Sequence, residues 1–276
     1  MQETSSRRRL LAGLSGLGTA LIAGCTASTP FVGRRLESSR TIDPVDATAI
    51  RFAGELGEVA IQGTDRDDIA MDIVKQSSSI TTDLEALSVT SKQENGTLTI
   101  ETVYDGSSSR LEHTPSVNLD VTLPHDLQVE QVTTQVGAID VQNIQGDTTL
   151  ETTTGRVTAR QVDGFVSAET TTGRTEIRNI QGIGNIRGTT GRHAVDIPAI
   201  DGDTSVRTTT GQIAAAISST LDAELIAAAT TGQITIDGLS VDIHEEGDSY
   251  VHGILGDGGP TLRLETTTGQ ISITDL

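Results

Sequence analysis

Tryptophan is absent from this chain of 276 residues, and aromatic side chains make up only 2% of it. A core must therefore be made from Val, Ile, Leu, Ala and Thr, which suits thin, stacked layers better than one thick globular core. Cysteine occurs once, as Cys25, so no internal disulfide can form.

Lysine is nearly absent, because Lys75 and Lys92 are the only two among 19 basic residues. Acidic residues number 38, and the net charge is -19. A balance this acidic and this poor in lysine is typical of proteins from salt-adapted organisms, in which dense carboxylates keep the surface hydrated. It also argues against nucleic acid as a partner, because phosphate binding needs a concentrated basic surface.

The first 24 residues have the features of an export signal. Arg7 and Arg8 lie in Ser-Arg-Arg-Arg-Leu-Leu, which resembles a twin-arginine signal, and the apolar stretch 10–23 is too short to span a membrane comfortably. This stretch runs into Leu-Ile-Ala-Gly-Cys at 21–25, which resembles a lipobox. The resemblance implies that Cys25 is lipid-modified, becomes the first mature residue and anchors an extracytoplasmic protein to the cell membrane, facing outside. The alternative is an ordinary apolar N-terminus with an unrelated cysteine.

Residues 25–41 are rich in Ser, Thr and Arg and show no apolar period, so we expect a tether between the lipid and the folded domain. Its arginines could touch anionic lipid headgroups, although a solvated linker is the plainer interpretation. These arginines are Arg34, Arg35 and Arg40.

Residues 42–125 predict an irregular all-β half. Short runs of alternating apolar and polar residues, separated by Gly, Asn, Asp and Pro, are typical of strands. Asn95-Gly96 between two such runs is a strong hairpin signal, 83–87 could form a helical turn, and 105–109 should be a flexible loop. The expected strands are 49–52, 58–61, 69–74, 87–89, 98–103 and 117–124.

Residues 126–276 contain a repeat built on the run Thr-Thr-Thr-Gly. The glycines that end the copies lie 18 residues apart at first, then 20 and 21, and finally 37, which is close to two periods. A fixed period of this size is the mark of a repeat array, and we expect a repetitive β-solenoid of about 18 to 21 residues per turn. Complete copies end at Gly155, Gly173, Gly211 and Gly269, and divergent copies end at Gly137, Gly191 and Gly232.

Aligning the copies on this glycine predicts which side chains face inward. The positions five before, two after and four after it are mostly apolar and alternate with polar residues. The β-branched threonines should stack with their methyls packed and their hydroxyls bonded along the ladder, while the glycine turns the corner with φ > 0 or a close backbone approach. A flat threonine face that orders water or ice is the alternative, but charged residues beside the run would interrupt it.

A strand ending in Leu-Pro at 123–124, followed by repeated Thr-Gly-x-Ile/Val-x-Val/Ile units, resembles the DUF4097 family of adhesin-like β-strand repeat proteins. The resemblance covers roughly residues 45–276. It implies a β-solenoid without catalytic residues, so it supplies no active site that could be carried over to this chain.

An arginine follows the glycine in three successive copies, at Arg156, Arg174 and Arg192, and a glutamine follows it in the later copies. Arginines about 5 Å apart repel one another unless an anion or carboxylates lie between them. These three could therefore form an anion-binding stripe for acidic glycan or phosphate. The alternative is a solvated turn whose charge is softened by Glu151 and Glu169.

The longest interruption of the repeat contains the run His-Glu-Glu-Gly-Asp-Ser-Tyr-Val-His at 244–252. His244, Glu246, Asp248 and His252 are weak candidates for a divalent metal, because their spacing matches no recognised site. An acidic loop is the plainer interpretation.

Two features bear on catalysis and neither favours it. His193 occupies an inward slot filled elsewhere by Val, Thr or Ile, so a buried or rim histidine is expected rather than a catalytic one. Asp140, Asp147, Asp163 and Asp201 are scattered around the turns and are not paired as in polysaccharide-cleaving enzymes. No nucleotide-binding or nucleophile motif is recognisable, and no cofactor is expected.

We therefore predict a non-enzymatic cell-surface lipoprotein that presents a repetitive surface to a surface glycan or an envelope protein. A carbohydrate-active β-helix enzyme acting on acidic polysaccharide is one alternative, and a structural or signalling-accessory envelope protein is another. The last strand, 270–274, is expected to be an uncapped edge that invites edge-to-edge self-association.

Overall fold

The structure is a computed structural model that describes residues 33–105 and 115–276. These residues form strands joined by turns, and no helix long and apolar enough to cross a membrane occurs among them. The expected export signal with Arg7 and Arg8, the lipobox with Cys25, and residues 106–109 of the expected loop lie outside the described residues.

Fourteen strands make up the described chain. They are β1 Arg34–Ile42, β2 Ala49–Ala53, β3 Val59–Thr64, β4 Ile69–Ser77, β5 Leu87–Glu94, β6 Thr97–Tyr104, β7 Ser116–Pro124, β8 Gln128–Gln145, β9 Thr148–Ile197, β10 Thr204–Ile217, β11 Ala223–Asp237, β12 Asp242–Gly247, β13 Tyr250–Leu255 and β14 Thr261–Asp275.

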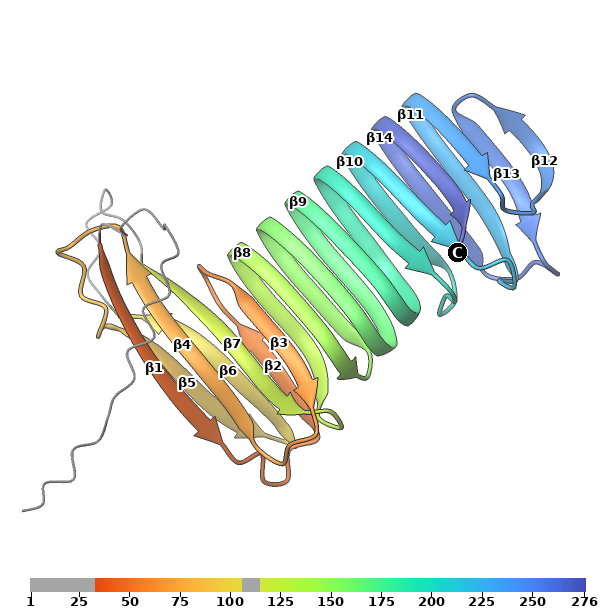
Figure 1. The fold of residues 1–276 in the computed structure, drawn as a ribbon. Helices are drawn as coiled ribbons and strands as arrows, with labels where there is room; N and C mark the ends of the chain where they lie inside the picture. Colours follow the sequence, from red (N-terminus) through yellow and green to blue (C-terminus); the bar gives the residue numbers. More distant parts are fainter. Residues whose placement is uncertain (1–32, 106–114) are drawn as a thin grey trace, which may run out of the picture. The chain divides into compact units, whose positions relative to one another are not determined.

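Hydrogen bonds join these strands into one mixed sheet that branches at β8 (Figure 1). The first part of β8 pairs with β2, which continues to β6 and β5, whereas the later part pairs with β3, which continues to β7, β4 and β1. Phe52 and Ile100 on the first branch and Ile61 and Met71 on the second are buried in one apolar cluster. Mostly aliphatic side chains therefore fill this half, as a chain without tryptophan requires.

The strands expected between 42 and 125 are confirmed by β2 to β7. Asn95 and Gly96 have φ of 51° and 80° between β5 and β6, as a two-residue hairpin turn requires. The turn expected at 83–87 is present as a single turn, in which the Leu87 N–H donates to the Leu84 carbonyl, and no helix forms there.

The tether predicted over 25–41 is wrong for its second part, because residues 34–42 form β1, paired antiparallel with β4. Most of β1 is exposed, so its residues need no apolar period to form a strand. Its arginines bind protein groups: Arg34 donates to the Thr82 carbonyl at 2.9 Å and Arg40 to the Ser91 hydroxyl at 2.8 Å.

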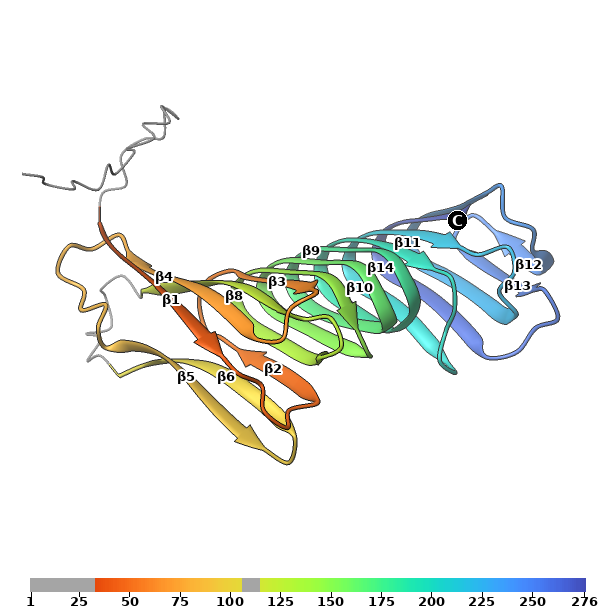
Figure 2. The ribbon, with the colours of Figure 1, turned by 60° about the horizontal axis from the view of Figure 1, so that its bottom comes forward.

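From β8 onward the chain winds in successive turns, and equivalent positions of the repeat lie side by side in parallel strands (Figures 1 and 2). Gly137 is paired with Gly155, and Gly191 with Gly211. The period of the sequence is therefore the number of residues in one turn of the winding.

The second corner of each early copy depends on a residue in the left-handed conformation. Asn143, Gln161 and Asn179 have φ of 53°, 53° and 54°, and each stands three residues before a glycine. Asparagine is enriched in this region of φ/ψ space. Asn143 and Asn179 thus mark the second corner in the sequence itself.

Near the C-terminus, the spatial order of the strands differs from their order along the chain. β14 pairs in parallel with both β10 and β11, so the last strand lies between two earlier ones. The 37-residue step is not two turns, because it contains the hairpin of β12 and β13, which pairs antiparallel with β11.

The prediction that the last strand is an uncapped edge is therefore wrong. The edge at this end is β12, whose six residues are all exposed and include Glu245 and Glu246. Charges on an edge strand oppose pairing with another sheet.

The inward positions predicted from the alignment form the core of the winding. Ile234 and Ile236 are only half-buried, because the hairpin covers β11 only from Ala223 to Ala228. The other aligned positions are buried: Leu150, Val157, Ala159, Ala168, Thr175, Ile177, Ile186, His193, Val195, Val206, Ile213, Ala215, Ala227, Leu264, Ile271 and Ile273.

Candidate functional site

A column of glycines forms the first corner of every turn. A Cβ atom added to Gly155, Gly173 or Gly191 would lie 1.7 to 1.8 Å from the carbonyl oxygen of the glycine one turn earlier. These glycines also have φ between 157° and 158°. The close backbone approach predicted for this corner is confirmed, and it brings the residues beside each glycine close to their counterparts on the neighbouring turns.

The three threonines before the glycine play two different roles. The first is buried at Thr152, Thr170, Thr208 and Thr266. The hydroxyls of Thr152, Thr208 and Thr266 donate to backbone carbonyls of the preceding turn, as Thr152 does to Gly137 at 3.4 Å, whereas the Thr170 hydroxyl has no partner among the described residues. The ladder therefore uses hydroxyl-to-carbonyl bonds, whereas the second and third threonines of each run are exposed.

These exposed threonines form two columns along the corner of the winding. In spatial order the first column is Thr153, Thr171, Thr189, Thr209, Thr267 and Thr230, and the second is Thr154, Thr172, Thr190, Thr210, Thr268 and Thr231. Hollows of about 240 and 340 Å³ flank the first column near its two ends.

Arg156, Arg174 and Arg192 are exposed and stand directly after three successive glycines of the column. The structure therefore aligns them in one stripe, about 5 Å apart by the spacing of neighbouring strands. Arg192 donates a hydrogen bond to Gln212 of the next turn. Within the described ranges, Arg156 and Arg174 form no ion pair.

Glu151 and Glu169, the carboxylates expected to offset the positive charge of this stripe, form no ion pair with its arginines in the described part of the chain. Glu151 accepts hydrogen bonds from Gln131 at 3.3 Å and from Thr133 at 3.4 Å, on the other side of the threonine columns. Glu169 lines the same hollow as Glu151. Among the residues that the structure describes, Arg156 and Arg174 thus have no carboxylate partner, and an external anion could bind them.

Two of the scattered aspartates, Asp140 and Asp147, contact neighbouring turns through their side chains. Arg160 lies between Asp140 at 3.6 Å and Glu176 at 3.4 Å, on the turns before and after its own. Asp147 accepts the backbone N–H of Phe165 at 2.9 Å. Such contacts tie neighbouring turns together.

The histidines of the hairpin lie together, but the acidic candidates do not join them. The rings of His244 and His252 are 5.6 Å apart, and His252 is hydrogen-bonded to Glu224 at 2.9 Å. That bond, with a second from Thr261, lowers the pKa of Glu224. Across the part of the chain that the structure describes, no three potential ligands, Glu246 and Asp248 included, are grouped to hold a metal ion.

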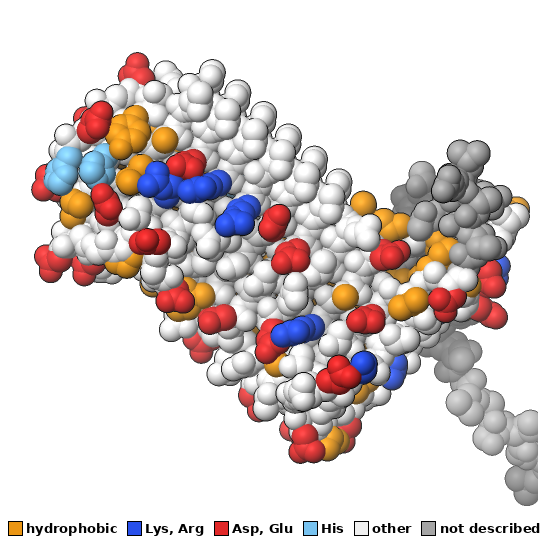
Figure 3. Space-filling view, turned by 180° about the vertical axis from the view of Figure 1, so that it is seen from behind, with side chains coloured by type: hydrophobic (Ala, Val, Ile, Leu, Met, Phe, Trp, Pro, Cys, Tyr) orange, Lys and Arg blue, Asp and Glu red, His pale blue; other side chains and the backbone are white. Residues whose placement is uncertain are grey.

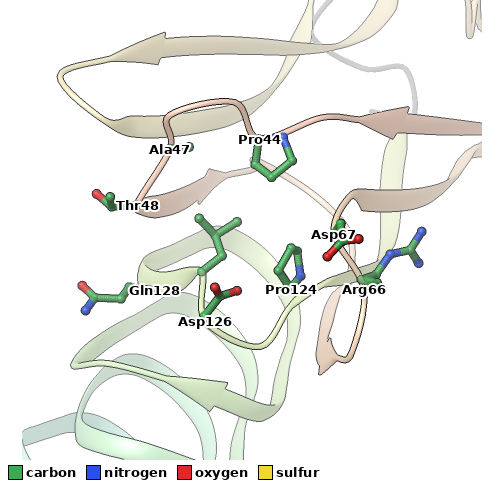
Figure 4. A pocket seen from close by; sticks show the side chains of 9 residues that line it. Pro44, Ala47, Thr48, Arg66, Asp67, Pro124, Asp126 and Gln128 are labelled. Atoms are coloured by element: carbon green, nitrogen blue, oxygen red, sulfur yellow. The ribbon is translucent and has the colours of Figure 1, made fainter.

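A larger cavity of about 490 Å³ lies where three connections meet, before β2, after β3 and after β7 (Figure 4). Its lining mixes Pro44, Pro124 and Leu127 with the carboxylates of Asp67 and Asp126. The arginine beside them is already engaged, because Arg66 pairs with Asp68 at 2.6 Å. The cavity therefore has no free cation to attract an acidic ligand.

The alignment on glycine missed a second group of arginines. Arg187, Arg207 and Arg263 line a hollow of about 290 Å³ on the face formed by β9, β10 and β14. Arg187 and Arg207 share one position of the repeat and are register partners on neighbouring turns. Arg263 lies at a different position of its copy, and it joins them because β14 lies beside β10. The repeat period alone could not have shown that Arg263 belongs to this group.

No protein-family profile and no curated protein matches this chain. Similar solved structures include a "putative cell adhesion protein" from Clostridium sporogenes, with 12% identity and a TM-score of 0.36, covering 88% of this chain and 100% of that one. A "putative adhesin" from Bacteroides fragilis has 13% identity and a TM-score of 0.40, with 87% and 97% covered. A "putative lipid binding protein" from Parabacteroides distasonis has 12% identity and a TM-score of 0.37, with 87% and 96% covered.

Proposed function

We propose that the protein is a non-enzymatic, lipid-anchored cell-surface protein of the adhesin type, built as a β-solenoid that binds acidic surface glycan along its side. The parallel, in-register stacking of the turns carries this proposal. It repeats the same exposed side chains at a fixed interval, two threonines and then an arginine or glutamine at each corner. Such a surface suits a polymeric ligand, because one repeating partner can make the same contact on several turns.

The chemistry of the corner supports a binder of anions. Guanidinium groups bind carboxylate and sulfate in a fixed fork geometry, and the adjacent threonine hydroxyls can donate further hydrogen bonds. The stripe stands out in a chain whose net charge is -19. Salt should screen the long-range attraction between the arginines and an anionic glycan. Direct hydrogen bonds and ion pairs with the glycan must therefore supply the affinity.

Replacing Arg156, Arg174 and Arg192 together by glutamine should weaken binding to an acidic polysaccharide about two- to threefold, because each contact made by an exposed, salt-screened guanidinium group contributes only modestly to affinity. Glutamine is the residue that follows the glycine in the later copies, so the fold should tolerate it. Retention on immobilised polygalacturonate, with neutral dextran as the control, measures the effect. Unchanged retention would remove the stripe from the binding surface.

The enzymatic alternative is tested on the same material. Incubating the protein with polygalacturonate should give retention without the release of shorter chains, measured by size-exclusion chromatography of the polysaccharide. Product release would identify a carbohydrate-active enzyme instead. A protein that neither retains nor cleaves any acidic glycan would fit the structural or accessory alternative.

Anchoring through Cys25 is the second part of the proposal. Cys25→Ser should move the exported protein from the membrane fraction to the soluble fraction, because its lipid attachment atom is lost. Fractionation followed by immunoblotting measures this shift. Arg7→Lys/Arg8→Lys serves as the comparison, since it should block export without removing the cysteine; a Cys25→Ser protein that stays in the membrane would exclude the anchor.

A further inference from the structure

The outward face of five neighbouring strands carries an unusual set of side chains. Register places two rows across β13, β11, β14, β10 and the end of β9. The first row is Tyr250, Ala228, Glu265, Arg207 and Arg187, and the second is His252, Ile226, Arg263, Ser205 and Asn185. We call these ten residues the cross-strand patch.

The basic part of the patch has an excess of guanidinium groups. Arg207 and Arg263 share one carboxylate, that of Glu265, at 3.0 and 3.1 Å. Arg187 forms no ion pair with any residue in the described ranges. Figure 3 shows basic side chains in a row on this face, beside the two histidines. The one acid that lines the hollow of about 290 Å³, Asp203, accepts the Thr261 backbone N–H at 2.9 Å.

The hollow between these arginines also offers neutral polar groups. Ser205, Thr204, Thr261 and Asn185 line it. The three hydroxyls already donate, to the Asn185 side-chain oxygen at 2.7 Å, the Gly202 carbonyl at 3.1 Å and the Glu224 carboxylate at 3.1 Å, so they can only accept from a ligand. The Asn185 amide nitrogen remains as the neutral donor beside the guanidinium groups.

The other end of the patch is apolar. Tyr250 is one of only two tyrosines in a chain without tryptophan, and its half-exposed ring stands two strands from Glu265 in the same row. Ile226 is half-exposed between His252 and Arg263. A rigid aromatic ring two strands, about 10 Å, from the strand that carries Arg263 fits an extended ligand that has both an apolar ring face and an anionic group.

The patch ends where the charge changes sign. Beyond Arg187, the equivalent positions on the two preceding turns are Glu169 and Glu151. An anionic ligand would therefore be held from β13 to β9 and repelled beyond them. This boundary gives the patch a defined length of five strands.

We propose that the cross-strand patch is a specific site for an acidic polysaccharide, in which Arg187, Arg207 and Arg263 bind the carboxylate or sulfate groups and Tyr250 packs on a sugar ring. The inference rests on the proposed glycan-binding function but moves the main site from the corner stripe to this face. Two rows of different side chains can select one ligand, whereas the stripe repeats a single residue.

Two triple variants with the same change of charge test this assignment. Arg187→Gln/Arg207→Gln/Arg263→Gln alters the patch, and Arg156→Gln/Arg174→Gln/Arg192→Gln alters the stripe. Affinities for polygalacturonate, which carries only carboxylates, for dextran sulfate and for neutral dextran are measured by calorimetry on the soluble Cys25→Ser protein. The thermal midpoint of each variant shows that it is folded.

The patch variant should bind about tenfold more weakly or worse, because three charge-assisted contacts are lost, and the stripe variant should bind less than about threefold more weakly. Tyr250→Ala should also lower affinity, with no change in the slope of affinity against salt, whereas the arginine changes should reduce that slope. Higher affinity for polygalacturonate would indicate a carboxylate ligand, and higher affinity for dextran sulfate would indicate a sulfate ligand.

Loss of binding in the stripe variant with normal binding in the patch variant would overturn this inference and leave the proposed function standing. Equal weakening in both variants would also overturn it, because it would indicate attraction by overall charge. If the wild-type protein bound neither acidic probe, this inference and the proposed function would fall together.

Discussion

Gly173→Ala is expected to destabilise the protein by about 3 kcal/mol or more, one of the largest effects of any single methyl group in this chain. The added Cβ would lie 1.7 Å from the Gly155 carbonyl oxygen and 2.8 Å from its carbonyl carbon. Neither atom can move alone, because the Gly155 backbone is itself held against Gly137 on the turn before. Relief of the clash must therefore separate whole turns, which breaks the parallel hydrogen bonds between them.

Gly54→Ala is the matched control for this substitution. A Cβ at Gly54 would lie 3.6 Å from the Thr102 hydroxyl and 3.7 Å from the Thr133 carbonyl oxygen, which are ordinary contacts. Its stability should change by less than about 1 kcal/mol. Urea unfolding followed by circular dichroism measures both variants, and a Gly173→Ala protein as stable as Gly54→Ala would disprove the role assigned to the glycine column.

The corner and the core could be predicted because they depend on local chemistry. Glycine at a fixed period and an alternating apolar pattern determine which residues turn and which face inward, and Leu150, Val157 and Ala159 illustrate the result. The place of β14 could not be predicted in the same way. The copies ending at Gly211 and Gly269 both continue as Gln-Ile, so local pairing does not distinguish the possible neighbours.

The order of the last turns depends on longer-range structure. β13 covers β11 with antiparallel pairing, which leaves the other edge of β11 for β14. No periodic signal in the sequence marks this reversal. The tether over 25–41 was misjudged for a related reason, because β1 is an exposed edge strand whose partner, β4, supplies the hydrogen bonds that its composition does not suggest.

One candidate site could be predicted from the sequence, and the other could not. Arg156, Arg174 and Arg192 were found from the sequence because they share one position of the repeat. Arg263 lies two positions earlier in its copy than Arg207 does in its own, and 56 residues separate them in the chain. Only the register between β10 and β14 shows that both face the same hollow.

His193 explains why one copy of the repeat has lost its first threonine. The side chain is fully buried, and neither ring nitrogen has a hydrogen-bond partner in the described structure. A Cβ at Gly188, which replaces the buried threonine of other copies, would lie 2.1 Å from the His193 Nε2 atom. Glycine at 188 thus makes room for the imidazole. In this copy a larger side chain at 193 is matched by the loss of the threonine side chain at 188.

Burial lowers the pKa of His193 to about 4, from an ordinary value of 6.5. The unfolded chain therefore binds one more proton than the folded chain between these two values, so stability is full above about pH 6.5 and falls as the pH approaches about 4. The difference corresponds to about 3 kcal/mol, of which between 2 and 3 should be lost by about pH 4.5.

The double variant Gly188→Thr/His193→Ile should lose this part of the acid sensitivity. It recreates the pair of Thr208 and Ile213 that the next turn already contains, with the same spacing. At about pH 7.5 it should be more stable than the wild type by about 1 to 3 kcal/mol, because two unpaired buried nitrogens are removed. Gly188→Thr alone should be strongly destabilised by the clash with the imidazole.

Urea unfolding at about pH 7.5 and about pH 4.5 measures the effect as a difference between the wild type and the double variant. The comparison is needed because 38 acidic residues also titrate toward the lower pH, and they are the same in both proteins. The wild type should lose between 2 and 3 kcal/mol more than the double variant. Equal losses in the two proteins would show that His193 keeps an ordinary pKa in the folded protein. Water would then reach the His193 side chain, in contradiction to its burial in the structure.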